Sequence, residues 1–317
     1  MKKIIYSFIA SLLLSGSAFA QASNEIAVFT KNKVDPFFEE ARIGANVAAA
    51  SFGLKTTQYA PTKPNNFQEQ IAEVEDAITR RPKGMLFVPT DSQGLKPSVD
   101  KVRQSGIPIV NFIDAGVGNY NGYVVYNDRK MAAEVTGLLT KALNGKGNVI
   151  IIEGVKGTGV SDNRTAGAQD ALAKSPEIKV LAVQPANYQR GQALQVTENL
   201  LQQFPKIDAV VANSDNMALA ALEAFAAAGR PKPLVVSMDG TVEGVSSVAA
   251  GGLFAVSEFS GFLMGCVGVE MLEKLSKGEK VPERITLNAA LITKENASQF
   301  MVPIDKRKCK SIVELGF

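Results

Sequence analysis

Residues 26–38, IAVFTKNKVDPFF, decide the fold that this sequence predicts. The apolar run 26–29 is typical of a buried parallel strand, and the polar residues after it form a loop. Asp35 then stands at an N-cap position and Pro36 at the first helical position, so a helix begins here and an amphipathic pattern continues it through 37–51. The segment is therefore a strand–loop–helix unit. Its loop lies at the carboxyl end of the strand, where open α/β sheets bind ligands.

Two adjacent aromatic residues, Phe37 and Phe38, follow the carboxylate of Asp35 on this loop. Apolar ring faces beside a carboxylate suit a sugar-like ligand, which has apolar faces and hydroxyl edges. The alternative is that both rings belong to the core and Asp35 serves only as a helix cap. The segment alone does not separate the two interpretations.

Apolar strands alternate with helical patterns along the rest of the chain, and the series occurs twice. The first series has strands at 56–59, 85–88, 107–114 and 124–126 and helices at 65–81 and 95–105. The second has strands at 149–152, 180–183, 209–212, 234–238 and 254–257, and helices at 131–143, 164–173, 189–204, 216–229, 262–275 and 294–300, with a further segment at 285–292. This alternation predicts right-handed crossovers, parallel sheets and a doubled α/β fold.

The first twenty residues form a predicted signal peptide. Lys2 and Lys3 precede an apolar run at 4–14, and Ala18-Phe19-Ala20 gives the small-residue cleavage pattern. No cysteine stands directly after the predicted cleavage site, so no lipid anchor is expected there, and no later run is long and apolar enough to cross a membrane. We therefore expect an exported, unanchored protein that a second membrane retains in the periplasm.

Composition excludes several functional classes. Loss of Lys2 and Lys3 lowers the formal charge from +3 to +1, which gives no electrostatic footprint for nucleic acid. The sequence has no histidine, so neither a Ser-His-Asp triad nor a histidine-ligated metal site can form. We expect no cofactor and no metal.

The chain has two cysteines, Cys266 and Cys309. An exported protein can form a disulfide. Cys266 lies in an apolar helical pattern, whereas Cys309 lies in a basic tail, and sequence does not show that their Cα atoms approach. The pattern favours two separate thiols without deciding the matter.

Carboxylates end several of the predicted strands. Asp114, Asp239 and Glu258 stand at strand ends, as Asp35 follows the first strand. Carboxylate oxygens accept hydrogen bonds from sugar hydroxyls, but two such acids can also form the acid–base pair of a glycosidase. Sequence spacing leaves both options open.

Arg164 and Asp215 lie where the pattern starts helices. A cation at a helix N-terminus is electrostatically unfavourable, so we expect Arg164 to be compensated by ligand hydroxyls or a carboxylate. Asp215 reads as the cap of the helix beginning at Asn216. The glycine-rich loop 154–159 fits neither dinucleotide nor P-loop spacing, so nucleotide binding is not expected.

Five ordered motifs give the chain a resemblance to a known family: 35–38 (DPFF), 89–92 (PTDS), 106–108 (GIP), 213–218 (NSDNMA) and 238–241 (MDGT). The set, which spans nearly the whole mature chain, resembles the periplasmic sugar-binding proteins of ABC importers, in particular the ribose-binding type that shares its fold with LacI-type repressors. The resemblance implies two similar Rossmann-like lobes with parallel sheets, joined by a three-strand hinge and closing on a sugar.

The resemblance also implies lobe bounds and residue roles. The first lobe would comprise 24–126 with 259–287 and the second 127–258 with 288–317, with crossings near Tyr126, Glu258 and 287–289. Phe37, Phe38 and Tyr188 would stack on the sugar, Arg164 would clamp it, and Asp239 would accept its hydroxyls. The predicted ligand-binding residues are Lys31, Asp35, Phe37, Phe38, Asp114, Arg164, Tyr188, Ser214, Asp239 and Glu258.

The sequence departs from ribose binders at several of these positions. Those proteins have asparagine where this chain has Asp35 and Val88, Asp-Arg at 113–114, where this chain has Ile-Asp, a hinge glutamine in place of Glu258, and asparagine in place of Ser214. The site is thus more acidic and less amide-rich, so ribose does not follow as the ligand. The tail after Ala290 is also longer, and the sequence gives it no role.

We therefore expect a monomeric periplasmic receptor, not an enzyme, that delivers a small sugar or polyol to the permease of an ABC importer. A chemoreceptor is a further compatible partner. The alternatives are a periplasmic carbohydrate-modifying enzyme, suggested by the strand-end acids, and a sensor of a related hydroxylated signalling compound. A transcriptional regulator would need a helix-turn-helix where the signal peptide stands.

Overall fold

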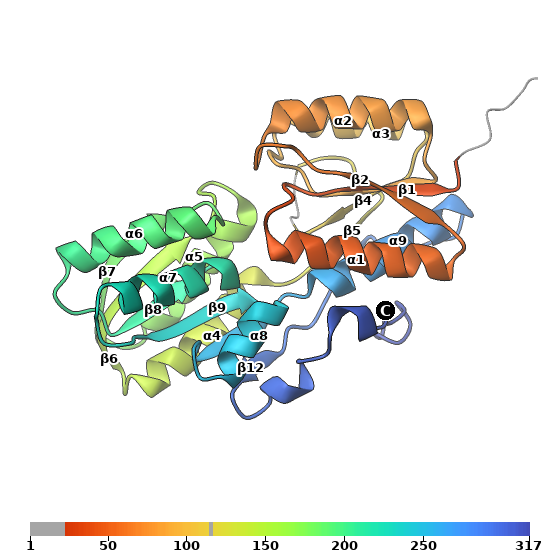
Figure 1. Cartoon of the computed structure of the whole chain (residues 1–317). Coiled ribbons are helices and arrows are strands. Elements are labelled where there is room, and N and C mark those ends of the chain that lie inside the picture. The colour runs from red at the N-terminus through yellow and green to blue at the C-terminus, as the bar shows by residue number, and fades with distance from the viewer. Residues whose placement is uncertain (1–22, 114–116) are drawn as a thin grey trace, which may run out of the picture.

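A computed structural model describes residues 23–113 and 117–317. The predicted signal peptide at 1–20 and the candidate Asp114 lie outside the described residues. Figure 1 shows two α/β units side by side, and each contains one six-stranded sheet. None of the helices in the described ranges combines the length and apolarity needed to span a bilayer.

The first lobe is built on the sheet β11-β5-β4-β3-β1-β2. Its strands, all paired in parallel, are β1 (Glu25–Phe29), β2 (Lys55–Tyr59), β3 (Gly84–Phe87), β4 (Ile109–Phe112), β5 (Gly122–Val125) and β11 (Arg284–Thr286). Helices α2 (Phe67–Arg80) and α3 (Lys96–Gln104) cover one face, and α1 (Pro36–Ser51) and α9 (Gly261–Ser276) cover the other (Figure 1).

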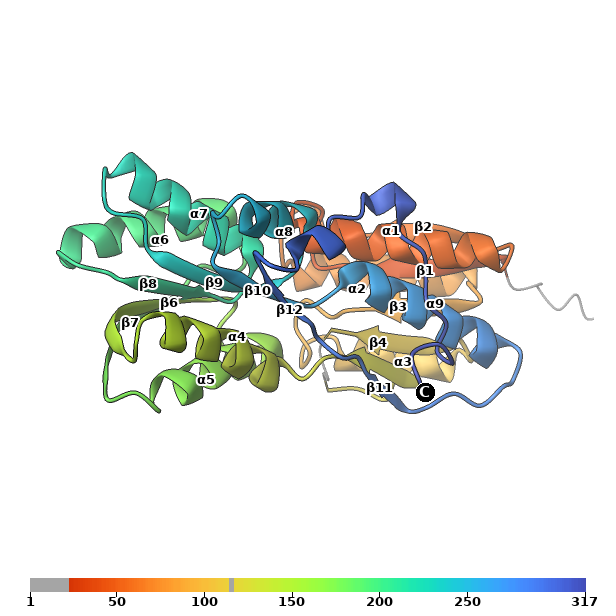
Figure 2. The same cartoon turned by 90° about the horizontal axis from the view of Figure 1, so that it is seen from below.

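The second lobe is built on the sheet β12-β10-β9-β8-β6-β7. Its strands are β6 (Lys146–Glu153), β7 (Glu177–Pro185), β8 (Ala209–Ala212), β9 (Leu234–Asp239), β10 (Ala255–Glu258) and β12 (Leu291–Thr293), of which β12 alone is antiparallel to its neighbour. Figure 2 shows α4 (Asp128–Ala142) and α5 (Gly159–Leu172) on one face, and α6 (Arg190–Gln203), α7 (Asp215–Ala227) and α8 (Val242–Ala249) on the other.

The two sheets repeat one strand order. Counted along the chain, the first five strands of each lobe lie in the order 2-1-3-4-5, so the doubling predicted from the sequence is confirmed. Strand β8 and residues 149–152 of β6 are continuous apolar runs, as expected for strands that helices bury on both faces. The chain passes between the sheets after β5, after β10, and again between β11 and β12.

Helices α1 and α9 of the first lobe pack closely against each other beside the hinge. A Cβ atom on Gly44 would stand 2.0 Å from the carbonyl oxygen of Phe262, and one on Gly265 would stand 2.2 Å from that of Ala41. Only glycine allows the two helix backbones to come this close. A Cβ atom on Gly261 would stand 2.6 Å from the carbonyl oxygen of Phe37, so the first turn of α9 lies directly against the first turn of α1.

Three details of the helix and strand predictions were wrong. Helix α5 begins at Gly159, so Arg164 lies in its second turn; the first turn has few strong helix formers and gives a weak signal. Helix α8 was missed for the same reason, because it is short and contains glycine and serines. The predicted helix at 294–300 contains only the 3₁₀ turn Ala297–Gln299. Segment 285–292, by contrast, divides between strands of the two sheets, which agrees with the crossing predicted at 287–289.

The cysteines form a disulfide, which corrects the preference for separate thiols. Cys266 on α9 and Cys309 in the tail are joined, with their Cα atoms 5.5 Å apart. The backbone N–H of Ile312 also donates to Glu270 on α9, at 2.9 Å. The last residues are thus attached to the first lobe, although we predicted 288–317 with the second. The partners are 43 residues apart in sequence, so no local pattern indicates the contact.

Candidate functional site

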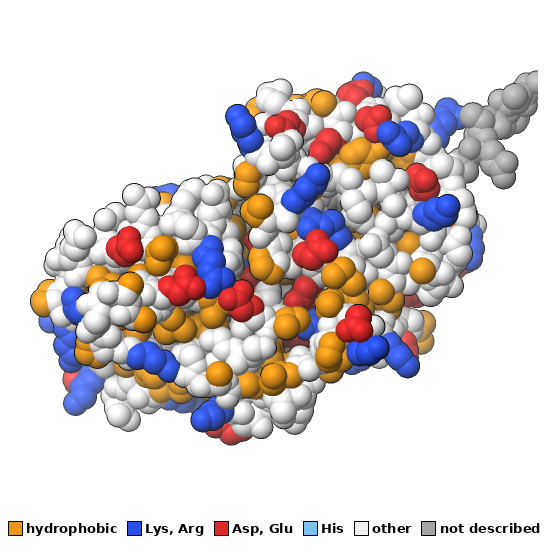
Figure 3. All heavy atoms as spheres, viewed as in Figure 1, with side chains coloured by type: hydrophobic (Ala, Val, Ile, Leu, Met, Phe, Trp, Pro, Cys, Tyr) orange, Lys and Arg blue, Asp and Glu red, His pale blue; other side chains and the backbone are white. Residues whose placement is uncertain are grey.

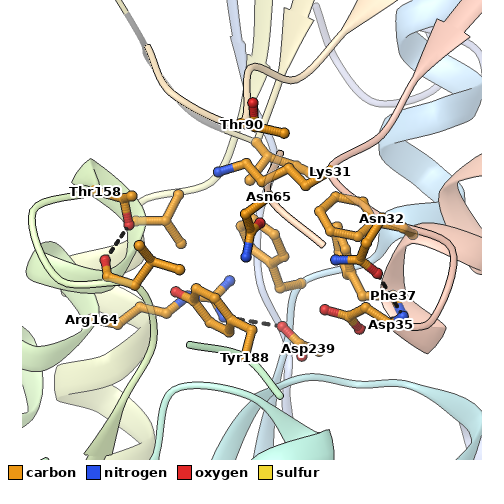
Figure 4. A pocket seen from close by; sticks show the side chains of 15 residues that line it. Lys31, Asn32, Asp35, Phe37, Asn65, Thr90, Thr158, Arg164, Tyr188 and Asp239 are labelled. Carbon is orange, nitrogen blue, oxygen red and sulfur yellow. Dashed lines mark hydrogen bonds and ion pairs between the residues drawn. The ribbon is translucent and has the colours of Figure 1, made fainter. Parts of the chain in front are cut away.

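A pocket lies between the lobes, where the carboxyl ends of the strands of both sheets face each other. Figure 3 shows the surface hollowed between the two units, and Figure 4 shows the pocket from close by. We call its first-lobe side the first wall: Lys31, Asn32, Asp35, Phe37, Phe38, Asn65, Thr90 and Ile113. The second wall comprises Val155, Thr158, Val160, Arg164, Tyr188 and Asp239, and Phe259 on the connection between the lobes completes the lining.

Backbone capping shapes the first wall. Asp35 is the N-cap of α1, and its Oδ1 accepts from the backbone N–H of Phe37 at 3.1 Å. The side-chain oxygen of Asn32 accepts from the N–H groups of Asp35, at 2.8 Å, and of Val34. Arg42, two helical turns after Asp35, donates to the carbonyl of Asn32 at 3.0 Å. The loop is therefore held in one conformation by its own residues and by α1.

The carboxyl group of Asp35 is buried in this wall. Burial raises its pKa to about 6, against the opposing effects of the Phe37 N–H and of the Arg164 and Arg42 guanidinium groups. An acceptor held away from water in this way gains more from a ligand hydroxyl than an exposed one would.

Aromatic rings line the base of the pocket. The centroids of Phe37 and Phe38 lie 5.4 Å apart, and Phe37 lies 5.2 Å from Phe259. Phe259 in turn packs on Tyr126, at 4.9 Å. Phe37 and Phe38 are buried in the hydrophobic core and also line the pocket, so a place in the core is compatible with the predicted contact to a ligand.

A buried ion network shapes the second wall. Arg164 donates through Nε to Asp128, at 2.8 Å, and through Nη1 to Asp239, at 3.0 Å. Nη1 also donates to the carbonyl of Asn213, at 2.6 Å, and the guanidinium group lies 4.2 Å from the centroid of the Phe259 ring. Within the described residues these contacts use Nε and Nη1, which leaves Nη2 to donate to a ligand.

Charge balance in this network comes from the protein. Burial alone would lower the pKa of Arg164, but Asp128 and Asp239 outweigh it and raise that pKa above its usual range. Burial raises the pKa of Asp239 well above its ordinary value, and Arg164 opposes the shift. The compensation expected for Arg164 is therefore supplied by carboxylates, although the residue lies further inside its helix than predicted.

Four pocket residues have backbone conformations that side chains rarely adopt. The φ angles are +143° at Asp239, +81° at Ile113, +61° at Asn65 and +60° at Tyr188. Such conformations cost free energy and persist where the surroundings impose them, which is common at ligand sites. At Asp239, the strained residue ends β9 with its carboxylate directed at Arg164 (Figure 4).

Two predicted site residues lie outside the pocket as the described residues define it. Ser214 is the N-cap of α7, where its hydroxyl accepts from the N–H of Met217. Glu258 lines a separate hollow beside the tail, and burial raises its pKa while Arg307 opposes the shift. Asp215 is the first residue of α7 and not its cap; its carboxylate accepts from Ser237 and Thr241 and so ties α7 to the end of β9.

Several residues that line the pocket were not among the predicted site residues: Asn32, Asn65, Thr90, Ile113, Val155, Thr158, Val160 and Phe259. Thr90 follows β3, and Asn65 precedes the N-cap of α2 in the connection after β2. The rule that ligands lie at the carboxyl ends of strands identifies both loops. Gln70 on α2 positions the loop of Thr90. Its side-chain nitrogen donates to the carbonyl of Val88, and its side-chain oxygen accepts from the N–H of Thr90.

Comparison with known proteins agrees with this architecture. Residues 26–280 match the model of the periplasmic binding protein domain. The ribose import binding protein of Salmonella typhimurium is 32% identical, over 93% of this chain and 99% of that protein. The xylitol-binding protein of Mycolicibacterium smegmatis is 29% identical, over 95% of this chain and 87% of its own length.

A solved structure gives the same result. The chain is similar to the periplasmic solute-binding protein of an ABC transporter from Actinobacillus succinogenes, which was crystallised with bound D-allose. The TM-score is 0.83 at 26% identity, and the match covers 87% of this chain and 99% of that one. Two α/β lobes, their strand order and these likenesses establish that the chain belongs to the periplasmic binding protein family, as a member of the ribose-binding type.

Proposed function

We propose that this protein is a monomeric periplasmic receptor that captures a small sugar or polyol between its lobes and delivers it to the permease of an ABC importer. One observation carries the proposal: buried hydrogen-bonding groups with fixed orientation face the same pocket from both lobes, beside apolar rings. Asp35 lies on the first wall, and Arg164 and Asp239 lie on the second. This combination suits a compact molecule that has several hydroxyl groups on a carbon skeleton.

Each group has a defined part in the proposed binding. Asp35 and Asp239 would accept from ligand hydroxyls, and Nη2 of Arg164 would donate to a hydroxyl oxygen. Phe37, Phe38 and Tyr188 would cover the C–H faces of the ligand. Lys31 and Asn65, whose side-chain nitrogens point into the pocket in Figure 4, would add donors at its upper side.

Closure follows from the division of these groups between lobes. A ligand that contacts both walls has more interactions in the closed arrangement than in an open one, so it shifts the population toward closure. The permease would then recognise the closed form. A carbohydrate-modifying enzyme has less support, because Glu258 lies outside the described pocket and cannot pair there with Asp239.

A thermal-shift screen tests the proposal. The panel comprises D-ribose, D-allose, xylitol, D-apiose and myo-inositol, with sucrose as a larger control. A compound that binds only the native state raises the midpoint temperature of unfolding. At a ligand concentration a hundred times Kd, the free energy of unfolding increases by about 2.7 kcal/mol. The same mixtures are analysed for turnover. The absence of a shift across the panel, or the chemical conversion of a bound compound, would contradict the proposal.

A further inference from the structure

The tail returns from β12 to the first lobe and passes beside the hinge. Figure 1 shows it in dark blue, running below α1 to the C-terminus. The disulfide between Cys266 and Cys309 fixes this course, and the Ile312 N–H contact with Glu270 adds a second attachment to α9. Arg307, two residues before the disulfide, is thereby held at the junction of the lobes.

Glu40 connects this tail to both lobes. It lies on the first turns of α1 and is buried. Its Oε2 accepts from Nη1 of Arg307, at 2.7 Å, and its Oε1 accepts from the backbone N–H of Val242, at 3.1 Å. Val242 is the first residue of α8, so a single carboxylate joins the tail, the first lobe and the second lobe.

The position of this contact relates it to the pocket. Glu40 follows Asp35, the N-cap of the same helix, by little more than one turn, and Val242 follows Asp239 by three residues. The bond between Glu40 and Val242 therefore holds together the two short segments that carry the facing acids of the pocket. A rigid helix α1 transmits any displacement at Glu40 to Asp35 and Phe37.

The charge of Arg307 is needed to keep Glu40 in place. The side chains of Glu40 and Arg307 are 10% and 16% exposed, so this pair is much less screened than the surface pairs of the protein. Without the guanidinium group, the Glu40 carboxylate would have to remain largely desolvated with only the Val242 N–H, or else turn toward water. Either outcome weakens the link between α1 and α8.

We propose that Glu40 and Arg307 are positioning residues for the ligand site, and that the Cys266–Cys309 disulfide anchors Arg307 in that role. The inference rests on the proposed function, since it concerns how tightly the same pocket holds its ligand. It also gives the long tail a role that the sequence did not show: the tail stabilises the arrangement in which Asp35 and Asp239 face each other.

The test compares four variants of the full mature protein. Arg307→Gln and the double variant Cys266→Ser/Cys309→Ser release the tail contact. Lys306→Gln is the matched control, because it removes the same charge from the neighbouring tail residue, whose side chain is 72% exposed. Arg307→Gln/Glu40→Gln is the rescue, since glutamine keeps an oxygen for the Val242 N–H and removes the Glu40 carboxylate that Arg307→Gln alone would leave without its cation.

Titration calorimetry with the highest-affinity compound of the panel gives Kd. We expect Arg307→Gln and the cysteine double variant to raise Kd about fivefold. Lys306→Gln should leave it unchanged, and the rescue variant should recover most of the loss. X-ray scattering of the ligand-free proteins should show a larger radius of gyration for Arg307→Gln than for wild type and Lys306→Gln.

The readouts distinguish the possible failures. If Arg307→Gln lowers the unfolding midpoint but leaves Kd and the radius of gyration unchanged, the tail is only a structural brace and the inference is wrong. An equal effect of Lys306→Gln also overturns it, because the effect would then be one of net charge. If wild type binds no panel compound, the proposed function fails, and the scattering comparison alone still decides whether Arg307 sets the position of the lobes.

Discussion

The two walls of the pocket are held in place by different interactions. On the first wall, Asp35 and Phe37 are positioned by an N-cap, by the Asn32 side chain and by aromatic packing. On the second wall, Arg164 is positioned by Asp128, Asp239 and the carbonyl of Asn213 in a buried ion network. The partners on the first wall lie within a few residues of each other, whereas those on the second lie 36 to 75 residues apart.

This difference has energetic consequences. Loss of one capping hydrogen bond leaves a loop that water and neighbouring groups can still satisfy. Loss of one member of a buried ion network leaves its partners charged, desolvated and unpaired. We therefore expect substitutions on the second wall to affect both stability and binding more strongly than those on the first.

Arg164→Ala should have the largest effect. It leaves Asp128 and Asp239 buried without their shared cation and removes a ligand donor. We expect the free energy of unfolding to fall by about 3–5 kcal/mol and ligand affinity to fall more than about a hundredfold. Denaturant unfolding and calorimetry measure the two effects.

Arg190→Ala is the control, because Arg190 pairs with Glu223 and Glu243 on the surface. This substitution should lower the free energy of unfolding by less than about 1 kcal/mol. Similar losses for the two arginines would contradict the network account.

Asp35 should give the first wall a pH dependence. The pKa of Asp35 is raised to about 6 in the folded protein, so as the pH falls its carboxyl group takes up a proton at a higher pH in the folded state than in the unfolded state. The cost of burying the ionised group is therefore present above pH 6 and disappears as the pH falls toward 4, where stability gains on the order of 2 kcal/mol from this residue.

The variant Asp35→Asn isolates this contribution, since its amide oxygen can still cap α1. We expect its free energy of unfolding to exceed that of wild type most at pH 8 and to approach it near pH 4, as measured by urea unfolding of the ligand-free proteins. A constant difference across this pH range would show that Asp35 is not held in a desolvated site.

Phe37→Leu should weaken binding with a smaller effect on the fold. Leucine keeps most of the buried apolar volume, so stability should fall by less than about 1.5 kcal/mol. Loss of the flat ring face should lower affinity about tenfold, corresponding to 1.4 kcal/mol. Phe52→Leu, at an exposed C-cap of α1, is the control and should change neither quantity. Unchanged affinity in Phe37→Leu would assign this ring to the core alone.

Ser214→Ala should have the smallest effect on binding. Loss of the α7 cap costs about 1 kcal/mol of stability, while ligand affinity should stay within the error of calorimetry. A clear loss of affinity in this variant would return Ser214 to the ligand site and require a different arrangement of the lobes around the ligand.

The contrast between contacts of neighbouring residues and contacts of residues far apart in the chain also explains which features could be predicted from the sequence. The N-cap at Asp35 and the strand–loop–helix unit depend on residues that are adjacent in the chain, so the sequence alone was enough to predict them. The partners of Arg164, the disulfide of Cys309 and the link between Glu40 and Val242 depend on segments brought together by the fold. Motif order identified Arg164, Tyr188 and Asp239 as pocket residues, but it also included Ser214 and Glu258, because a strand-end position does not fix the direction of a side chain.

A crystal structure with the highest-affinity panel compound tests the central claim most directly. The account predicts an unmodified molecule between the walls, with its hydroxyl groups within hydrogen-bonding distance of Asp35 on one side and of Arg164 and Asp239 on the other. A ligand that contacts one wall only, or that binds outside the pocket between the lobes, would contradict it.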